Sequence, residues 1–216
     1  MSIEFVQAVE LLIDLHYLPS LEYITLLQSY DTIILEKHEY YVKQSYRNRC
    51  YINTAHGVDM LVVPLTGKHG KVPVKDVQID YATRWQNNHW RTIESAYRKA
   101  PYFEYYGDDM KQILYKPFQF LFDLNLELLS FCLKNIGHAP SISETMAYEK
   151  IPGSLITDLR SAIDAKIPYS ERPYYHPASY YQIFGNQFVP NLSLIDLLFC
   201  EGPRAGSLLK ASQHPG

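Results

Sequence analysis

The first thirty-five residues alternate between short apolar runs and one stretch of helical spacing. Residues 11–15 form an apolar run, residues 21–28 carry apolar side chains at three- and four-residue steps, and residues 32–35 are rich in β-branched side chains. This order predicts a strand, a helix and a second strand, which together open a parallel βαβ unit. Ligands of such units bind beyond the carboxyl end of the first strand. His16 would stand at that end.

A hairpin is predicted next. Residues 44–52 read QSYRNRCYI, and a turn at 53–57 separates them from an apolar strand at 60–65. If residues 44–52 are extended, Arg47 and Arg49 share one face, because side chains alternate along a strand. A helical conformation would separate the two guanidinium groups instead. Residues 66–73 predict an exposed hairpin tip, and residues 74–79 a returning strand.

Helices dominate the middle of the chain. A four-residue spacing of Trp85, His89, Ile93 and Tyr97 predicts one helix. Pro101 ends this helix at or before Ala100. A short helix is expected after residue 107, with an aspartate at 108 as its cap, and a longer one over residues 118–136.

The longest predicted helix carries one polar residue on its apolar stripe, Asn125. A buried amide without partners costs on the order of 1 to 3 kcal/mol. Asn125 therefore either holds a neighbouring backbone segment or lines a ligand pocket.

The pattern loosens from residue 151 onward, where several prolines divide the chain into short pieces. This indicates a long irregular segment around the domain, followed by a helix near residues 194–199 and a frayed tail over 204–216. The predicted fold is therefore α/β. We expect a single domain over residues 1–216, with a Rossmann-like βαβ opening, a mixed sheet, a helical middle and an irregular Pro-rich C-terminal region.

Composition narrows the classes of function. Apolar residues make up 47% of the 216 residues and charged residues 20%, which is typical of a globular protein. The net charge of -3, without a lysine or arginine tract, argues against DNA or RNA as the main partner. No run reaches the ~20 apolar residues of a membrane span, and acidic residues stand where a signal peptide would be positive, so a cytoplasmic location is expected.

Metal and redox sites have little support. The cysteines, at 50, 132 and 200, lack CxxC spacing and predict free thiols in a reducing compartment. His38 with Glu39, and His56 with Asp59, have unspecific spacing that surface histidines explain equally well, so no metal site is expected. The patterns GxGxxG, GxxxxGK[ST], HExxH and GxSxG are absent, which lowers support for standard dinucleotide folds, P-loop NTPases, zincins and serine hydrolases.

Tyrosine is the one compositional excess, with nineteen residues in several clusters. An aromatic ring with a polar tip suits a wet pocket for a sugar or a nucleotide. Packing in the core and loops explains the same residues without a ligand.

Six strings, in order along nearly the whole chain, resemble the WbqC-like protein family. They are YLPSLEY (17–23), KQSYRNRCYI (43–52), LVVPL (61–65), WRTIESAYRKAPYFEYY (90–106), DLNLELL (123–129) and FVPNLSLIDLLFCEGP (188–203). The chain resembles the compact form of the family and is shorter than longer relatives between residues 137 and 190.

The resemblance implies a bacterial protein of surface-polysaccharide biosynthesis, of the lipopolysaccharide O-antigen type. The implied activity is glycyl transfer to the amino group of an amino sugar, with a nucleotide-sugar or glycan precursor as the small-molecule partner. ATP or an activated glycine donor would then be the co-reactant, and no cofactor is otherwise expected. A non-catalytic binding or scaffolding protein of the same pathway is the alternative.

Forming an amide on a sugar amine requires a base for the ammonium proton and a site for the developing oxyanion. His16 is the candidate catalytic base because of its place after the first strand. His89 is the second candidate, or it packs against Trp85; an ordinary hydrogen-bonded role is the alternative for both histidines.

Arg47 and Arg49 suit the phosphates of a nucleotide-sugar or an adenylated donor, since guanidinium pairs with phosphate through two hydrogen bonds. Surface salt bridges are the alternative for these two residues. Tyr17 and Asn48 lie within the same family strings. The expected substrate-binding residues are therefore Tyr17, Arg47, Asn48, Arg49, His89 and Asn125.

Overall fold

The βαβ opening predicted from the sequence is present. The computed structural model describes residues 9–67 and 71–213. Strand β1 (Glu10–Asp14) is followed by helix α1 (Leu21–Leu27) and by strand β2 (Thr32–Glu36), and β1 and β2 pair in parallel. Ser20 caps α1 by accepting a hydrogen bond from the Tyr23 N–H at 3.4 Å.

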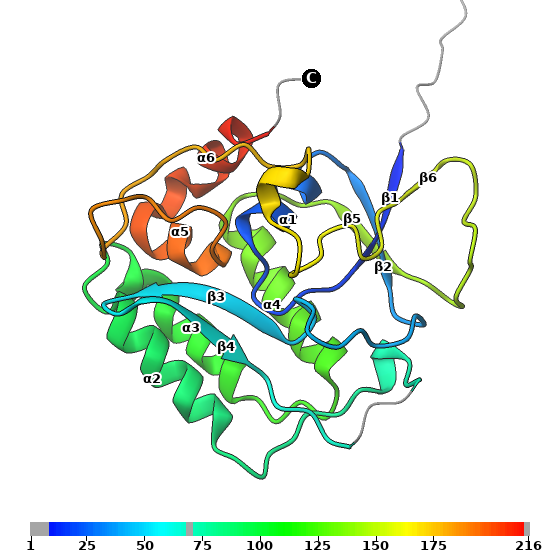
Figure 1. Cartoon of the computed structure of the whole chain (residues 1–216), viewed down its shortest axis with the longest axis horizontal. Coiled ribbons are helices and arrows are strands. Elements are labelled where there is room, and N and C mark those ends of the chain that lie inside the picture. Colours follow the sequence, from blue (N-terminus) through cyan, green and yellow to red (C-terminus); the bar gives the residue numbers. More distant parts are fainter. Residues whose placement is uncertain (1–8, 68–70, 214–216) are drawn as a thin grey trace, which may run out of the picture.

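Two further strands, which the sequence analysis did not anticipate, complete a parallel sheet. Strand β5 (Ser141–Glu144) pairs with β2, and β6 (Ile156–Asp158) pairs with β1, giving the order β5-β2-β1-β6. Parallel pairing brings the carboxyl ends of all four strands to one edge (Figure 1). Every one of these strands ends in an acidic residue: Asp14, Glu36, Glu144 and Asp158.

The hairpin and most of the helices lie to one side of this sheet (Figure 1). The hairpin of β3 and β4 forms a separate antiparallel sheet, and β3 contacts α2 and α5. Helix α2 packs on α3, and α3 packs on α4 (Figure 1). The bounds are β3 (Arg49–Thr54), β4 (Gly57–Val62), η1 (Val74–Asp76), α2 (Trp85–Tyr97), α3 (Phe103–Tyr115), α4 (Leu121–Asn135), η2 (Tyr169–Glu171), α5 (Leu194–Glu201), η3 (Gly202–Arg204) and α6 (Ala205–Ala211).

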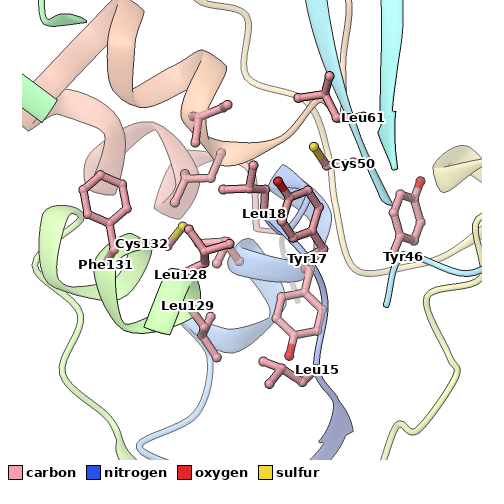
Figure 2. Packing of buried hydrophobic residues seen from close by; sticks show 14 of the residues in the cluster. Leu15, Tyr17, Leu18, Tyr46, Cys50, Leu61, Leu128, Leu129, Phe131 and Cys132 are labelled. Carbon is pink, nitrogen blue, oxygen red and sulfur yellow. The ribbon is translucent and has the colours of Figure 1, made fainter. Parts of the chain in front are cut away.

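The core lies between the sheet and the helices. Leu11 and Ile13 of β1 point into it together with Ile33 of β2, because alternate side chains of a strand share a face. Figure 2 shows Leu18, beyond the end of β1, among core residues that include Leu128 of α4. The three cysteines are free, as the sequence predicted, and all three are buried.

Four predicted elements differ from the structure. Residues 44–48 form turns, and the strand begins only at Arg49, because the backbone of Gln44 takes a φ of 58° and reverses the chain. Residues 74–79 contain η1 and isolated bridges instead of a strand. Asp108 lies inside α3, not at its start. The tail expected to fray contains α6, which buries Leu209.

None of the helices among the described residues has the length and apolar character needed to cross a membrane.

Candidate functional site

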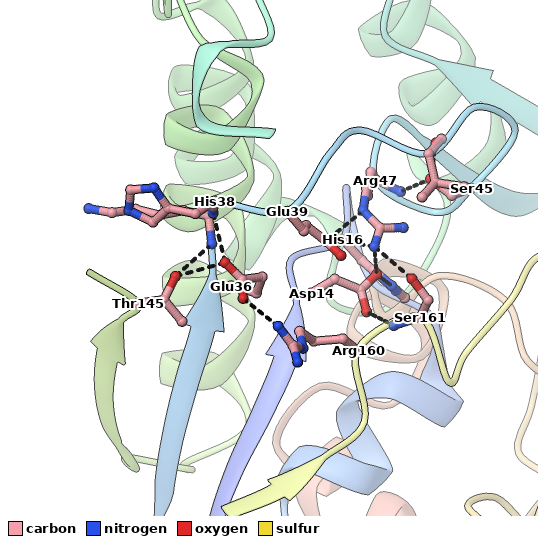
Figure 3. Close-up of polar contacts among 12 residues, drawn as sticks. Asp14, His16, Glu36, His38, Glu39, Ser45, Arg47, Thr145, Arg160 and Ser161 are labelled. Carbon is pink, nitrogen blue, oxygen red and sulfur yellow. Dashed lines mark hydrogen bonds and ion pairs between the residues drawn. The ribbon is translucent and has the colours of Figure 1, made fainter. Parts of the chain in front are cut away.

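A buried polar cluster lies at the carboxyl end of β1, centred on Asp14 (Figure 3). One carboxylate oxygen, Oδ1, accepts the backbone N–H of Ser161 at 2.7 Å, and Oδ2 lies 3.0 Å from His16 Nε2 and 3.1 Å from Arg47 Nη2. Burial alone would raise the pKa of Asp14, but Arg47, His16 and the hydrogen bonds outweigh burial and hold this pKa below its usual range. Asp14 is therefore an anion that fixes its neighbours.

His16 is oriented by this carboxylate. Its Nε2 faces Asp14, and its Nδ1 is buried without a hydrogen-bond partner among the described residues. The ring packs against Tyr23 and Tyr46, with centroid distances of 4.3 and 5.4 Å, and only 1% of the residue is exposed. If Nε2–H donates to Asp14, the lone pair on Nδ1 can accept a proton.

Arg47 is buried and bonded to several protein groups through Nε and Nη2. Its Nε and Nη2 donate to Glu39 Oε1 at 2.9 and 2.5 Å, and Nη2 also donates to Ser161 Oγ at 3.0 Å. Only 2% of the arginine is exposed. The guanidinium thus ties the end of β1 to the segment after β2 and to the segment after β6, and it meets His16 through Asp14.

Asn125 holds the backbone beside this cluster, which is one of the two roles considered for it. Its Nδ2 donates to the carbonyl of Arg47 at 2.7 Å, so α4 fixes the turn that carries the arginine. Its Oδ1 is buried without a partner in the described part of the chain.

Arg49 does not join the hydrogen bonds of the cluster. It lies on β3, and its Nη1 contacts the sulfur of Met60 at 3.8 Å. Burial raises the pKa of Tyr41, and the charges of Arg49 and Arg47 both oppose that rise. The shared strand face expected for them does not form, because Arg47 precedes the strand.

Tyr17 and His89 join the hairpin to the rest of the fold, and Asn48 links the two ends of the hairpin to each other. The hydroxyl of Tyr17 lies 2.9 Å from His89 Nδ1, and His89 Nε2 lies 3.1 Å from the carbonyl of Val62. Burial lowers the pKa of His89 to about 4, although the bond to that carbonyl opposes the change. Asn48 donates to the carbonyl of Val63 at 2.9 Å. His89 also packs against Trp85, with ring centroids 5.1 Å apart.

The sequence analysis missed the second half of the cluster. Glu36, at the end of β2, is fully buried and pairs with Arg160 at 2.9 Å. Arg160 also binds Asp158, and Ser161 next to it has a φ of 56°, a strained value for a residue with a side chain. The acidic residue that ends β2 was a usable signal, since strand ends meet at one edge in a parallel sheet. Arg160 and Ser161 could not be predicted as site residues, because the sequence pattern did not indicate strand β6.

Two cavities flank the cluster. One, of about 330 Å³, is lined by His38, Glu39, Tyr40 and Tyr148. The other, of about 320 Å³, is lined in part by Tyr46 and Tyr51, with Tyr169, Lys166 and Asn191. His16 packs against Tyr46, and Arg47 donates hydrogen bonds to Glu39. In the described ranges no three histidine, cysteine or acidic side chains are arranged to hold a metal ion.

Comparison with known proteins places these residues in a family. The model of the WbqC-like protein family matches residues 15–173, which include His16, Glu39, Arg47 and Ser161. The chain is 28% identical to an uncharacterized protein of Mycobacterium tuberculosis, Rv1507c, over 90% of this chain and 94% of the relative. No solved structure matches. The chain therefore belongs to the WbqC-like protein family.

Proposed function

We propose that the chain is a cytoplasmic transferase of bacterial surface-polysaccharide biosynthesis that forms an amide, by glycyl transfer, on the amino group of an amino sugar. The observation that carries the proposal is the Asp14–His16 pair at the carboxyl end of β1, with an unpartnered His16 Nδ1. A carboxylate that fixes a histidine tautomer is a recurring arrangement for general base catalysis.

The chemistry needs one proton acceptor. The amine nitrogen attacks the acyl carbon of an activated glycine, so that an N–C bond forms and the C–O bond to the leaving group breaks. The leaving group is the phosphate of an adenylate or the ribose oxygen of a charged tRNA. His16 Nδ1 takes the proton from the attacking nitrogen, and Asp14 stabilises the resulting imidazolium.

The surroundings suit a small polar substrate. Tyr46, which packs on His16, also lines the second cavity with Tyr51 and Tyr169, and aromatic rings with polar tips fit a sugar or a nucleotide. Lys166 supplies a positive charge in the same cavity. We assign the phosphate to this side of the molecule, because the guanidinium of Arg47 is already occupied by Glu39 and Asp14.

A direct test incubates the purified protein with nucleotide-linked amino sugars and either glycine with ATP or charged glycyl-tRNA. Mass spectrometry should find the sugar heavier by one glycyl residue. His16→Gln should lower the rate by about a hundredfold or more. His56→Gln, an exposed histidine on the β3–β4 turn, should leave the rate unchanged.

A binding protein of the same pathway remains the second candidate, and the burial of His16 favours it, since 1% exposure leaves the ring no direct contact with solvent. Under this alternative a precursor would bind at the tyrosine cavity without product. Saturable binding of the nucleotide-sugar, with no glycyl adduct from either donor, would select it.

A further inference from the structure

The carboxyl edge of the sheet carries an excess of negative charge. Five carboxyl groups gather there, from Asp14, Glu36, Glu39, Glu144 and Asp158. Their basic partners are Lys37, Arg47 and Arg160. Counted at full charge, the five carboxyl groups outnumber these three cations by two, and His16 also contacts Asp14. Such an edge attracts cations and disfavours anions.

Glu39 presents this charge to a cavity. Its Oε1 accepts hydrogen bonds from Nε and Nη2 of Arg47, whereas its Oε2 has no donor in the part of the chain that the structure describes. Only 9% of the residue is exposed, and it lines the cavity of about 330 Å³. A nearly buried carboxylate oxygen that faces an open cavity gains stability from a charged donor.

Aromatic rings form the rest of this cavity. Tyr40 and Tyr148 line it and remain 55% and 53% exposed. The ring of Tyr148 already has the guanidinium of Arg160 4.8 Å from its centroid. The other described lining residue is His38, and no lysine or arginine is among the described lining residues. Aromatic faces beside a carboxylate are the usual surroundings of a bound organic cation.

We propose that the cavity of His38, Glu39, Tyr40 and Tyr148 binds an organic ammonium group. Glu39 Oε2 accepts an N–H of the ligand, and the ring of Tyr40 covers its charged end. The proposal concerns binding alone and stands without the transfer reaction.

Matched ligands test the proposal. Cyclohexylamine, charged at pH 8, and cyclohexanol have nearly the same size, and NMR titration of the labelled protein measures both affinities. The ammonium should bind at least about tenfold more tightly than the alcohol, because a charge-assisted hydrogen bond exceeds a neutral one. The backbone signals of Tyr40 and Tyr148 should shift. Equal affinities, or shifts confined to other residues, overturn the proposal.

Variants localise the effect. Glu39→Gln should weaken ammonium binding by about tenfold while keeping an acceptor for Arg47. Tyr40→Ala should also weaken binding, and Tyr40→Phe should preserve it. Glu104→Gln and Tyr105→Ala, on exposed positions of α3, serve as controls. Binding unaffected by Glu39→Gln overturns the proposal, and if that variant does not fold, the wild-type shifts decide.

A second pair of ligands separates this inference from the transferase proposal. D-glucosamine and D-glucose differ at the amine, and glucosamine should show the same preference and the same shifted signals. Ammonium binding without any glycyl product refutes the transferase and leaves the cavity assignment intact. Product formation by a protein that does not distinguish the amine from the alcohol refutes the cavity assignment alone.

Discussion

Replacing Arg47 by methionine tests whether this residue holds the fold or a ligand. Arg47 is 2% exposed and contacts the buried carboxyl groups of Asp14 and Glu39. Methionine fills a similar volume but leaves both carboxyl groups without their cation. Removing one partner of a buried ion pair costs about 3 to 5 kcal/mol. We therefore expect Arg47→Met to lower the free energy of unfolding by about that amount.

Urea unfolding at pH 7, followed by circular dichroism, measures the change. Arg204→Met is the matched control, because Arg204 pairs with Glu201 on the surface at 3.1 Å and should lose less than about 1 kcal/mol. Adding Glu39→Gln to Arg47→Met should restore part of the stability, since one buried charge is then removed. A loss below about 1 kcal/mol for Arg47→Met would refute the structural role and return the arginine to phosphate binding.

Two other predictions concern protonation. The pKa of His89 is lowered to about 4 by burial, so the unfolded chain takes up a proton on this side chain that the folded chain resists. The stabilising contribution of His89 should therefore fall by about 3 kcal/mol as the pH drops from about 6.5 to 4. The difference in unfolding free energy between the wild type and His89→Gln should shrink by the same amount. A difference that stays constant over this pH range would contradict the lowered pKa of His89. Burial raises the pKa of the thiols of Cys50, Cys132 and Cys200, the last two to about 12, so a thiol reagent at pH 8 should label them only after denaturation. Rapid labelling of the native protein would contradict the burial of these thiols.

The sequence was sufficient for the opening of the fold because local patterns determine it. Apolar runs of strand length around a helix predicted β1, α1 and β2, and the position of His16 beyond β1 followed from that order. The amide of Asn125 on an apolar helix face correctly indicated a buried contact with backbone. Both inferences depend only on residues close together in the chain.

The rest of the site depends on distant residues. Strands β5 and β6 contain four and three residues, too few for a periodic pattern, and their pairing with β2 and β1 brings Arg160 and Ser161 to the site. From the sequence alone, Arg47 and Arg49 were given the same phosphate-binding role, because residues two positions apart share a face of a strand. The positive φ of Gln44 and the buried partners of Arg47 separate their roles, and neither feature is visible in a single sequence.

The claim on which the account depends is that His16 offers an unprotonated Nδ1 at the end of β1. Long-range ¹H–¹⁵N NMR of the imidazole at pH 8 tests this claim most directly, with His16→Gln to assign the signals. We expect the ring proton on Nε2, facing Asp14, and none on Nδ1. A proton on Nδ1, in either the other neutral tautomer or the imidazolium, would contradict the account and exclude His16 as the base.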